Sequence, residues 1–278
     1  MVSQIDSMSD RLVREGNVFR NTSAHSGRKV VITPENSSMQ HLCYARIKID
    51  SASPEVSFNT GNQETAIICL SGQAEFTVGE NKFTLGKHDA VYMPRGSQVE
   101  IRGKSADLAE FSAEVNGSYP LRVVRYVDVQ KDKSLHFLTG GPATTRDLNI
   151  LIGKNVQAGR VLAGFTISEP GNWTSWPPHE HAKMLEEMYV YIEMPPPGFG
   201  VQFVYTDTQE PDLVTVVREG DAVLMPCGYH PNVAAPGHRI GFIWAMAAHR
   251  EVEDRQFGVV NVQPEFSASA SGLEASRK

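Results

Sequence analysis

Short apolar segments rich in β-branched and aromatic residues dominate the first half of the chain, and each ends in a turn signal. They cover residues 41–49, 64–70, 74–79, 82–86 and 90–94. Gly, Pro, Asn and Ser mark the turns between them, as in Pro94-Arg95-Gly96. No stretch keeps a 3.6-residue apolar period over three turns, so only a few short helices are expected. The pattern predicts an all-β sandwich or barrel.

The second half repeats this pattern, and one motif occurs in both halves. Its strand-like segments cover residues 160–168, 186–194, 200–207, 213–220, 221–226 and 239–247. The motif D-A-V-x-M-P-x-G ends at Gly96 and again at Gly228, about 130 residues later. This recurrence predicts two copies of one jelly-roll domain, with the polar stretch 115–145 as the seam. The expected parts of the chain are residues 1–120, residues 121–263 and a flexible tail at 264–278.

The composition narrows the class of protein. Of the 278 residues, 41% are hydrophobic and 21% are charged, as in an ordinary globular protein. The net charge is −6 without any run of Lys or Arg, so neither a nucleic-acid surface nor a membrane-binding face is expected. Cys43, Cys69 and Cys227 are far apart, which argues for free thiols in a reducing compartment. Residues 1–20 hold no signal-peptide core, so we predict a cytoplasmic protein.

Candidate metal ligands gather in the second half. His179 and His181 alternate ahead of a strand-like segment, so in an extended chain their side chains share one face. Glu186 and Glu187 follow on opposite faces of that segment, and one of them can supply a carboxylate. His230 follows a Pro-Cys-Gly turn that would bring it across the barrel to the first pair. Three imidazoles and one carboxylate suit one divalent ion. Zn²⁺ is the first candidate, and the same ligands also suit Mn²⁺, Fe²⁺ or Ni²⁺.

This spacing resembles the two characteristic motifs of the cupin superfamily. H-x-H is followed by Glu, and then by G-x5-P-x-G-x-H ending at His230. The resemblance implies a bicupin, an all-β fold of two jelly-roll domains. In the first half, Pro94-Arg95-Gly96 is followed by Ser-Gln-Val, and no H-x-H precedes it. The N-terminal copy is therefore expected to bind no metal and to contribute packing, a pocket wall or a contact between subunits of a homo-oligomer.

Longer motifs carry a closer resemblance. They are T-P-E ending at Glu35, L-S-G-Q-A-E ending at Glu75, P-G-N-W-T-S-W-P-P-H-x-H ending at His181, L-E-E-M-Y-V-Y ending at Tyr191, P-P-P-G-F-G-V-Q-F-V-Y-T-D ending at Asp207, and V-V-R-E-G-D-A-V-L-M-P-C-G-Y-H ending at His230. On these motifs the chain resembles the 5-deoxy-glucuronate isomerases of myo-inositol catabolism, with the 5-keto-4-deoxyuronate isomerases as more distant relatives. E-M-Y-V-Y resembles the family's ligand-bearing strand, which favours Glu187 over Glu186 as the metal ligand.

The resemblance implies an aldose–ketose isomerase that converts 5-deoxy-glucuronate, a small sugar acid, into 5-dehydro-2-deoxygluconate. The reaction moves a proton between adjacent carbons through an enediolate, whose developing negative charge a metal stabilises. A group with a pKa near the working pH is needed to shuttle the proton. The candidates are Glu186, Tyr189, Tyr191, Tyr205 and Asp207. The ordinary alternative for the tyrosines is core packing, and for Asp207 it is a turn.

The substrate carboxylate requires a cation. Lys183 and Arg218 are the nearest in sequence to the candidate ligands, although either can equally be a solvated surface charge. Tyr229 and Trp176 are expected to contact the substrate, with aromatic core packing as their alternative.

Three departures from the family pattern leave other functions open. Only A-K-M separates His181 from Leu185, Cys227 stands where the family commonly has a basic residue, and T-Q-E-P-D follows Asp207 without the usual acidic and basic pair. The alternatives are an isomerase or epimerase of another sugar acid, an Fe²⁺ cupin oxygenase, or a non-enzymatic sugar-binding cupin. Oxygen uptake would identify an oxygenase, and binding without turnover would identify a sugar-binding protein.

Overall fold

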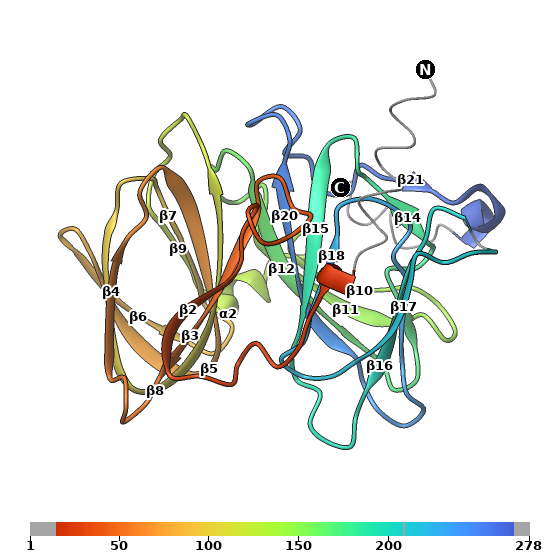
Figure 1. Ribbon diagram of the computed structural model, residues 1–278, viewed down its shortest axis with the longest axis horizontal. Coiled ribbons are helices and arrows are strands. Elements are labelled where there is room, and N and C mark those ends of the chain that lie inside the picture. The colour runs from red at the N-terminus through yellow and green to blue at the C-terminus, as the bar shows by residue number, and fades with distance from the viewer. Residues whose placement is uncertain (1–14, 208, 270–278) are drawn as a thin grey trace.

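Two β-sheet halves lie side by side in the computed structural model, which describes residues 15–207 and 209–269 (Figure 1). Helical structure in these ranges is confined to three short elements, η1 (Glu15–Asn17), α2 (Tyr126–Val129) and η2 (Pro264–Ser269). The all-β, two-copy architecture expected from the apolar pattern is confirmed. No described helix has the length and apolar character of a membrane span.

The first half is a jelly roll built around two long, bent strands, β5 and β8. Its strands, in pairing order, are β2 (Gly27–Ile32), β3 (Cys43–Ile49), β8 (Gln98–Glu114), β5 (Gln63–Val78), β7 (Ala90–Met93) and β9 (Arg122–Val124), with β4 (Glu55–Asn59) on β8 and β6 (Asn81–Gly86) on β5. The β5–β8 register shifts between Cys69 and Ser71, and such a bulge bends a strand. Gly72 follows with a positive φ, and a Cβ there would overlap the Ser105 carbonyl. The bend lets β5 pair first with β7 and then with β6.

The second half consists of a seven-stranded sheet, a four-stranded sheet and one short strand pair. The larger sheet has the order β1 (Val18–Phe19), β18 (Ala222–Met225), β15 (Leu185–Tyr191), β20 (Gly241–Ala248), β12 (Val161–Ser168), β11 (Arg146–Ile152) and β10 (His136–Thr139). The smaller sheet has the order β13 (Trp173–Thr174), β19 (Asn232–Ala234), β16 (Gly200–Val204) and β17 (Leu213–Val217). The short pair is β14 (His179–Glu180) with β21 (Asn261–Val262).

The two halves share one pairing plan. The D-A-V-x-M-P strand pairs antiparallel with β5 in the first half and with β15 in the second, so that Thr65 lies opposite Met93 and Glu187 lies opposite Met225. Thr65 is therefore the first-half equivalent of Glu187. The position two residues after the first Pro-x-Gly turn is Gln98, where the second half has a histidine. Thr and Gln thus stand at the places equivalent to two candidate metal ligands.

The N-terminal segment crosses to the second half. Val18 and Phe19 pair with the D-A-V strand β18, and the Arg20 guanidinium is 2.7 Å from the Asp221 carboxylate. The first jelly roll itself therefore begins at β2. We propose that the seam between the two domains lies between β9 and β10, close to the boundary expected at residues 120 and 121.

The structure describes the first six residues of the expected tail, which stays a prediction. Residues 264–269 form η2, and the ring of Phe266 lies edge-on to Trp176 with centroids 4.9 Å apart. Contact between these two partly buried rings stabilises the chain past residue 263. Residues 270–278 lie outside the described ranges.

A shared apolar core lies between the halves. It joins Tyr44 and Phe111 of the first half to Phe165 and Met188 of the second, and all four are buried. A separate buried cluster, which includes Phe76, fills the first barrel. Cys43, Cys69 and Cys227 are buried, and no disulfide joins them.

Two buried glutamates tie the halves together reciprocally. Glu186 on β15 accepts hydrogen bonds of 2.6–2.8 Å from three successive backbone N–H groups, at residues 40–42 of the first half. Glu64 on β5 accepts bonds of 2.6–2.7 Å from the backbone N–H groups of residues 159–161 in the second half. The shared register makes Glu64 and Glu186 equivalent positions, each fully buried. A carboxylate offers two acceptor oxygens and so matches three converging donors.

We expect Glu186→Gln to lower the free energy of unfolding by about 3 kcal/mol, because its amide turns one acceptor into an NH₂ group facing a backbone N–H. Glu64→Gln should have an effect of similar size. Glu75→Gln, at an exposed position on the same strand as Glu64, is the matched control and should change the value by less than about 0.5 kcal/mol. Urea denaturation measures all three. A Glu186→Gln protein as stable as the wild type would contradict the role of Glu186 in holding the two halves together.

Candidate metal centre and pocket

The pleat of β15 decides which glutamate can reach the second-half interior. Adjacent side chains of a strand face opposite ways. Glu186 faces the first half, where the backbone of residues 40–42 binds its carboxylate. Glu187 faces the interior of the second half, 3.0 Å from a histidine nitrogen. Glu187 is therefore the candidate ligand, whereas the carboxylate of Glu186, predicted as a catalytic base, is bound at the interface between the halves and does not line the pocket.

His181, Glu187 and His230 form a compact buried cluster, here called the metal trio. One ligand atom from each lies within 4.8 Å of the others, and this is the only such group among the described residues. The Nε2 atoms of His181 and His230 are each 3.0 Å from Glu187 Oε2. The three side chains come from separate segments: the loop after β14, strand β15, and the turn before β19.

Backbone carbonyls orient every histidine of the predicted quartet. A carbonyl can only accept, so Nδ1 carries a proton, and Nε2 is the nitrogen left to bind a metal ion. A second hydrogen bond of this kind is the usual support of a metal-binding histidine. The distances from Nδ1 to the carbonyl oxygen are 2.8 Å for His179, 3.1 Å for His181 and 2.9 Å for His230.

His179 lies beside the trio and is not part of it. Its ring centroid is 5.1 Å from that of His230 and 6.4 Å from that of His181. It lines the same pocket as His181 and Glu187. Its role as a fourth ligand stays a prediction.

The electrostatics of the trio favour an ionised carboxylate. Burial opposes ionisation of Glu187, but the hydrogen bonds and charges of His181 and His230 outweigh it and lower the pKa of Glu187 to about 2. Burial likewise opposes protonation of His181, yet Glu187 raises its pKa. For His179, burial together with the charge of His230 lowers the pKa to about 3, so this imidazole is neutral. A cation between these groups would take the place of the shared proton.

The donor set fits a divalent transition metal. Imidazole nitrogens and one carboxylate oxygen are ligands that zinc, manganese, iron and nickel all accept. The Nε2 atom of His230 is buried and faces the Glu187 carboxylate at 3.0 Å, but the angle does not make this a well-directed hydrogen bond, and no other residue in the ranges 15–207 and 209–269 offers one. Buried polar atoms are normally satisfied, and a metal ion would satisfy this one.

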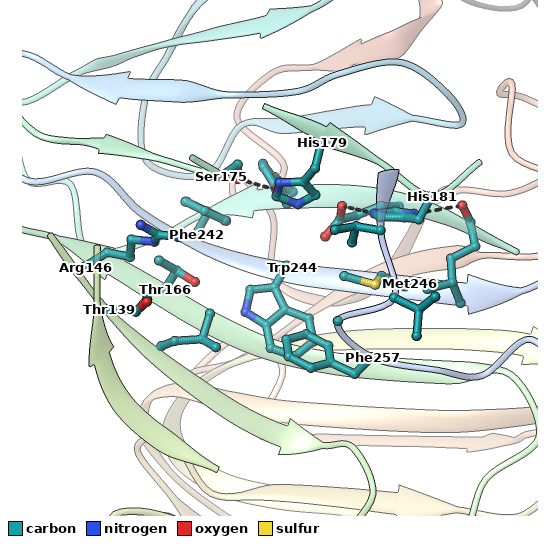
Figure 2. Close-up of a pocket in the computed structure, with 17 residues that line it drawn as sticks. Thr139, Arg146, Thr166, Ser175, His179, His181, Phe242, Trp244, Met246 and Phe257 are labelled. Carbon is teal, nitrogen blue, oxygen red and sulfur yellow. Dashed lines mark hydrogen bonds and ion pairs between the residues drawn. The ribbon is translucent and has the colours of Figure 1, made fainter. Parts of the chain in front are cut away.

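His181 and Glu187 of the trio open onto a pocket whose wall is formed mainly by strands of the larger sheet (Figure 2). Phe242, Trp244, Met246 and Phe257 supply much of its apolar wall. Its polar lining includes Thr139, Arg146, Thr166 and Ser175.

Of the residues predicted to be catalytic, Tyr189 alone lines this pocket. Its hydroxyl is 2.6 Å from Ser175 Oγ, and burial raises its pKa well above 10. Tyr191 lies two residues further along the same face, where its hydroxyl donates to Gln202 and the ring is fully buried. Tyr191 is therefore a core residue and not a catalytic one, because its hydroxyl is used inside the barrel.

Four other predicted residues lie outside the pocket lining. Tyr205 and Tyr229 face each other across a β-bridge, and the Tyr205 hydroxyl donates to Gln263. Asp207 is exposed and accepts a bond from a backbone N–H two residues on, as turn residues do. Trp176 packs within an aromatic cluster. Their predicted contacts with substrate are not supported, because packing and turn geometry already account for them.

The two cations predicted to bind the substrate carboxylate also lie outside the pocket. Lys183 and Arg218 are exposed and do not line the pocket. The pocket cation is Arg146, which sequence reasoning missed because it stands at the edge of the polar stretch read as a seam. The sequence offered only a weak signal for this role, namely that Arg146 is the first residue of the apolar segment 146–152.

Comparison with known proteins places the chain among sugar-acid isomerases. A family model described as the KduI/IolB family matches residues 18–261. The 5-deoxy-glucuronate isomerase of Geobacillus thermodenitrificans is 30% identical over 250 residues, which cover 81% of this chain and 88% of the relative. The enzyme of the same name from Lacticaseibacillus casei is 28% identical over 255 residues, covering 84% and 92%.

Solved structures show the same fold. An IolB-like protein from Salmonella typhimurium superposes with a TM-score of 0.80 at 21% identity, over 90% of this chain and 98% of that one. Oxalate decarboxylase from Bacillus subtilis superposes with a TM-score of 0.62 at 12% identity, over 82% and 76%. At these identities the likeness concerns the fold alone, and it agrees with the bicupin expectation.

Removing one trio side chain should prevent metal retention. We expect the wild-type protein to retain one equivalent of divalent metal after dialysis, and His230→Ala or Glu187→Ala to bind it roughly 100-fold more weakly. His238→Ala, a histidine outside the trio, is the control. Elemental analysis by mass spectrometry measures the content. Equal metal in His230→Ala and wild type would contradict the assignment.

Proposed function

We propose that this chain, which belongs to the KduI/IolB family, is a metal-dependent aldose–ketose isomerase that converts 5-deoxy-glucuronate into 5-dehydro-2-deoxygluconate. The observation that carries the proposal is the buried metal trio, two of whose members line a pocket that also holds a buried arginine. Relatives named 5-deoxy-glucuronate isomerase match along most of both chains and support the choice of substrate.

The trio provides the electrophilic end of the pocket. A divalent ion held by His181, Glu187 and His230 would polarise the carbonyl and the neighbouring hydroxyl of the sugar acid. The chain holds its ligand atoms ready for this, because backbone carbonyls lock the histidine rings before any ion or substrate binds. The apolar wall of Phe242 and Trp244 lowers the local dielectric and so strengthens these interactions.

Tyr189 is the best-placed protein group for proton handling. Its hydroxyl stays protonated at neutral pH because burial raises its pKa, so it acts as a donor and not as a base. Ser175 Oγ, 2.6 Å away, continues the hydrogen-bonded pair along the pocket wall. The pair can donate a proton to a substrate oxygen on which negative charge develops.

The metal identity and the assembly belong to the proposal. Zinc is the first candidate, and manganese, iron and nickel are alternatives because the same donor set suits all of them. A homo-oligomer and a cytoplasmic location stay predictions.

The metal-loaded protein should convert 5-deoxy-glucuronate into the ketose without oxygen. In deuterium oxide, NMR should show one solvent deuteron next to the carbonyl carbon, because the proton moves between adjacent carbons. The metal-free protein is the control and should give neither product nor exchange. Oxygen consumption coupled to turnover would favour an oxygenase instead, and binding without turnover would favour a sugar-binding protein.

Tyr189→Phe should lower kcat roughly 100-fold while metal content stays unchanged, because it removes only the donor hydroxyl. Tyr191→Phe, on the same face of the same strand, is the matched control and should keep kcat within about 2-fold of wild type while losing about 1 kcal/mol of stability. Steady-state kinetics and metal analysis test the pair. Equal effects of both variants on kcat would contradict the assigned role of Tyr189.

A further inference from the structure

A buried arginine without an acidic partner stands in the pocket wall. Arg146 is 6% exposed, and no carboxylate among residues 15–207 and 209–269 forms an ion pair with it. Its two terminal nitrogens donate to the carbonyls of Thr144 and Trp176, at 2.9 and 2.7 Å. A guanidinium has five N–H donors, so three remain for a ligand. A buried charge normally has a counter-ion, and here burial lowers its pKa to about 10.

Two more buried donors in the same pocket lack partners. Thr139 Oγ1 and Trp244 Nε1 make no hydrogen bond to any described residue, although both are shielded from water. Thr139 lies directly opposite Arg146 in the β10–β11 register. Buried polar atoms without partners are rare in native proteins, so a shared ligand is the economical explanation.

The backbone makes room for the Trp244 ring. Gly164 lies opposite Trp244 in the β12–β20 register, and a Cβ at this position would overlap the indole. Trp244 is also opposite Tyr189 on the other side of β20, so its ring shares the pocket face of that strand.

The pocket therefore has two chemically different ends. Figure 2 shows Arg146 and Thr139 gathered on one side, His181 on the other, and the Trp244 ring between them. The trio end suits a carbonyl, and the Arg146 end suits an oxyanion. A planar guanidinium matches a carboxylate with two parallel hydrogen bonds.

We propose that Arg146, together with Thr139 and Trp244, binds the substrate carboxylate and selects sugar acids whose carboxylate lies at the opposite end of the chain from the reacting carbonyl. The inference rests on the proposed function for the identity of the substrate. It replaces Lys183 and Arg218 with a cation that lines the pocket.

The test compares 5-deoxy-glucuronate with 5-deoxy-glucose, in which a hydroxymethyl group replaces the carboxylate. For Arg146→Gln we expect kcat/KM toward the acid to fall roughly 100-fold, and toward the neutral sugar to change by less than about 2-fold. Arg146→Lys should recover part of the loss, because lysine keeps the positive charge but lacks the planar guanidinium group that forms two parallel hydrogen bonds. Trp244→Phe should lower kcat/KM for the acid only, by about 5-fold. Lys183→Gln is the control and should leave both values unchanged.

A purely structural role for Arg146 would reduce activity on both sugars equally, and that result overturns the inference. The wild type supplies a test independent of folding defects: a wild-type preference for the acid below about 10-fold also overturns it.

Calorimetry separates this inference from the proposed function. If the wild type turns over neither sugar, the isomerase proposal fails. Binding of glucuronate but not glucose, lost in Arg146→Gln, would still support the carboxylate site, and equal binding of both would overturn it.

Discussion

The pleat of a single strand, β15, assigns two adjacent glutamates to two separate tasks. Glu186 faces the first half and accepts hydrogen bonds from three backbone N–H groups, whereas Glu187 faces the second half and belongs to the metal trio. Because side chains alternate, a slip of one residue would exchange both tasks at once. The docking of the halves and the geometry of the centre therefore depend on the same register. A rigid clamp beside the ligand helps to keep the trio ordered before metal binds.

Duplication of one domain explains why the two halves share the interface glutamate, although only one of them has the metal-binding glutamate. Glu64 occupies the place of Glu186 and clamps the second half as Glu186 clamps the first. The next residue is Thr65 where the second copy has Glu187, so only the second copy has the carboxylate for a trio. The first copy contributes its half of the shared core and a rigid support for β15. The chain thus uses one architecture twice, with interface chemistry in both copies and ligand chemistry in one.

The pocket draws on strands that lie far apart in the sequence. The trio comes from β15 and two connecting segments, and the opposite side comes from β10, β11 and β12. Antiparallel pairing brings Thr139 beside Arg146, and a glycine on β12 makes room for Trp244. The pocket has a metal-binding end and a basic end, with aromatic rings between them. A sugar acid has its carbonyl and its carboxylate at opposite ends, so it can reach both ends of the pocket.

Local spacing was enough to predict the all-β class, the two copies and the candidate ligands, because strand alternation and turn residues act over a few positions. It also led to the metal trio, since H-x-H, the Glu pair and the Pro-x-Gly-x-His turn are short motifs. The remainder depended on packing between distant strands. Spacing alone could not separate Tyr189, which reaches the pocket, from Tyr191, whose hydroxyl is used in the core. Nor could it find Arg146, because a cation's role depends on whether other strands bury it and leave it without a counter-ion.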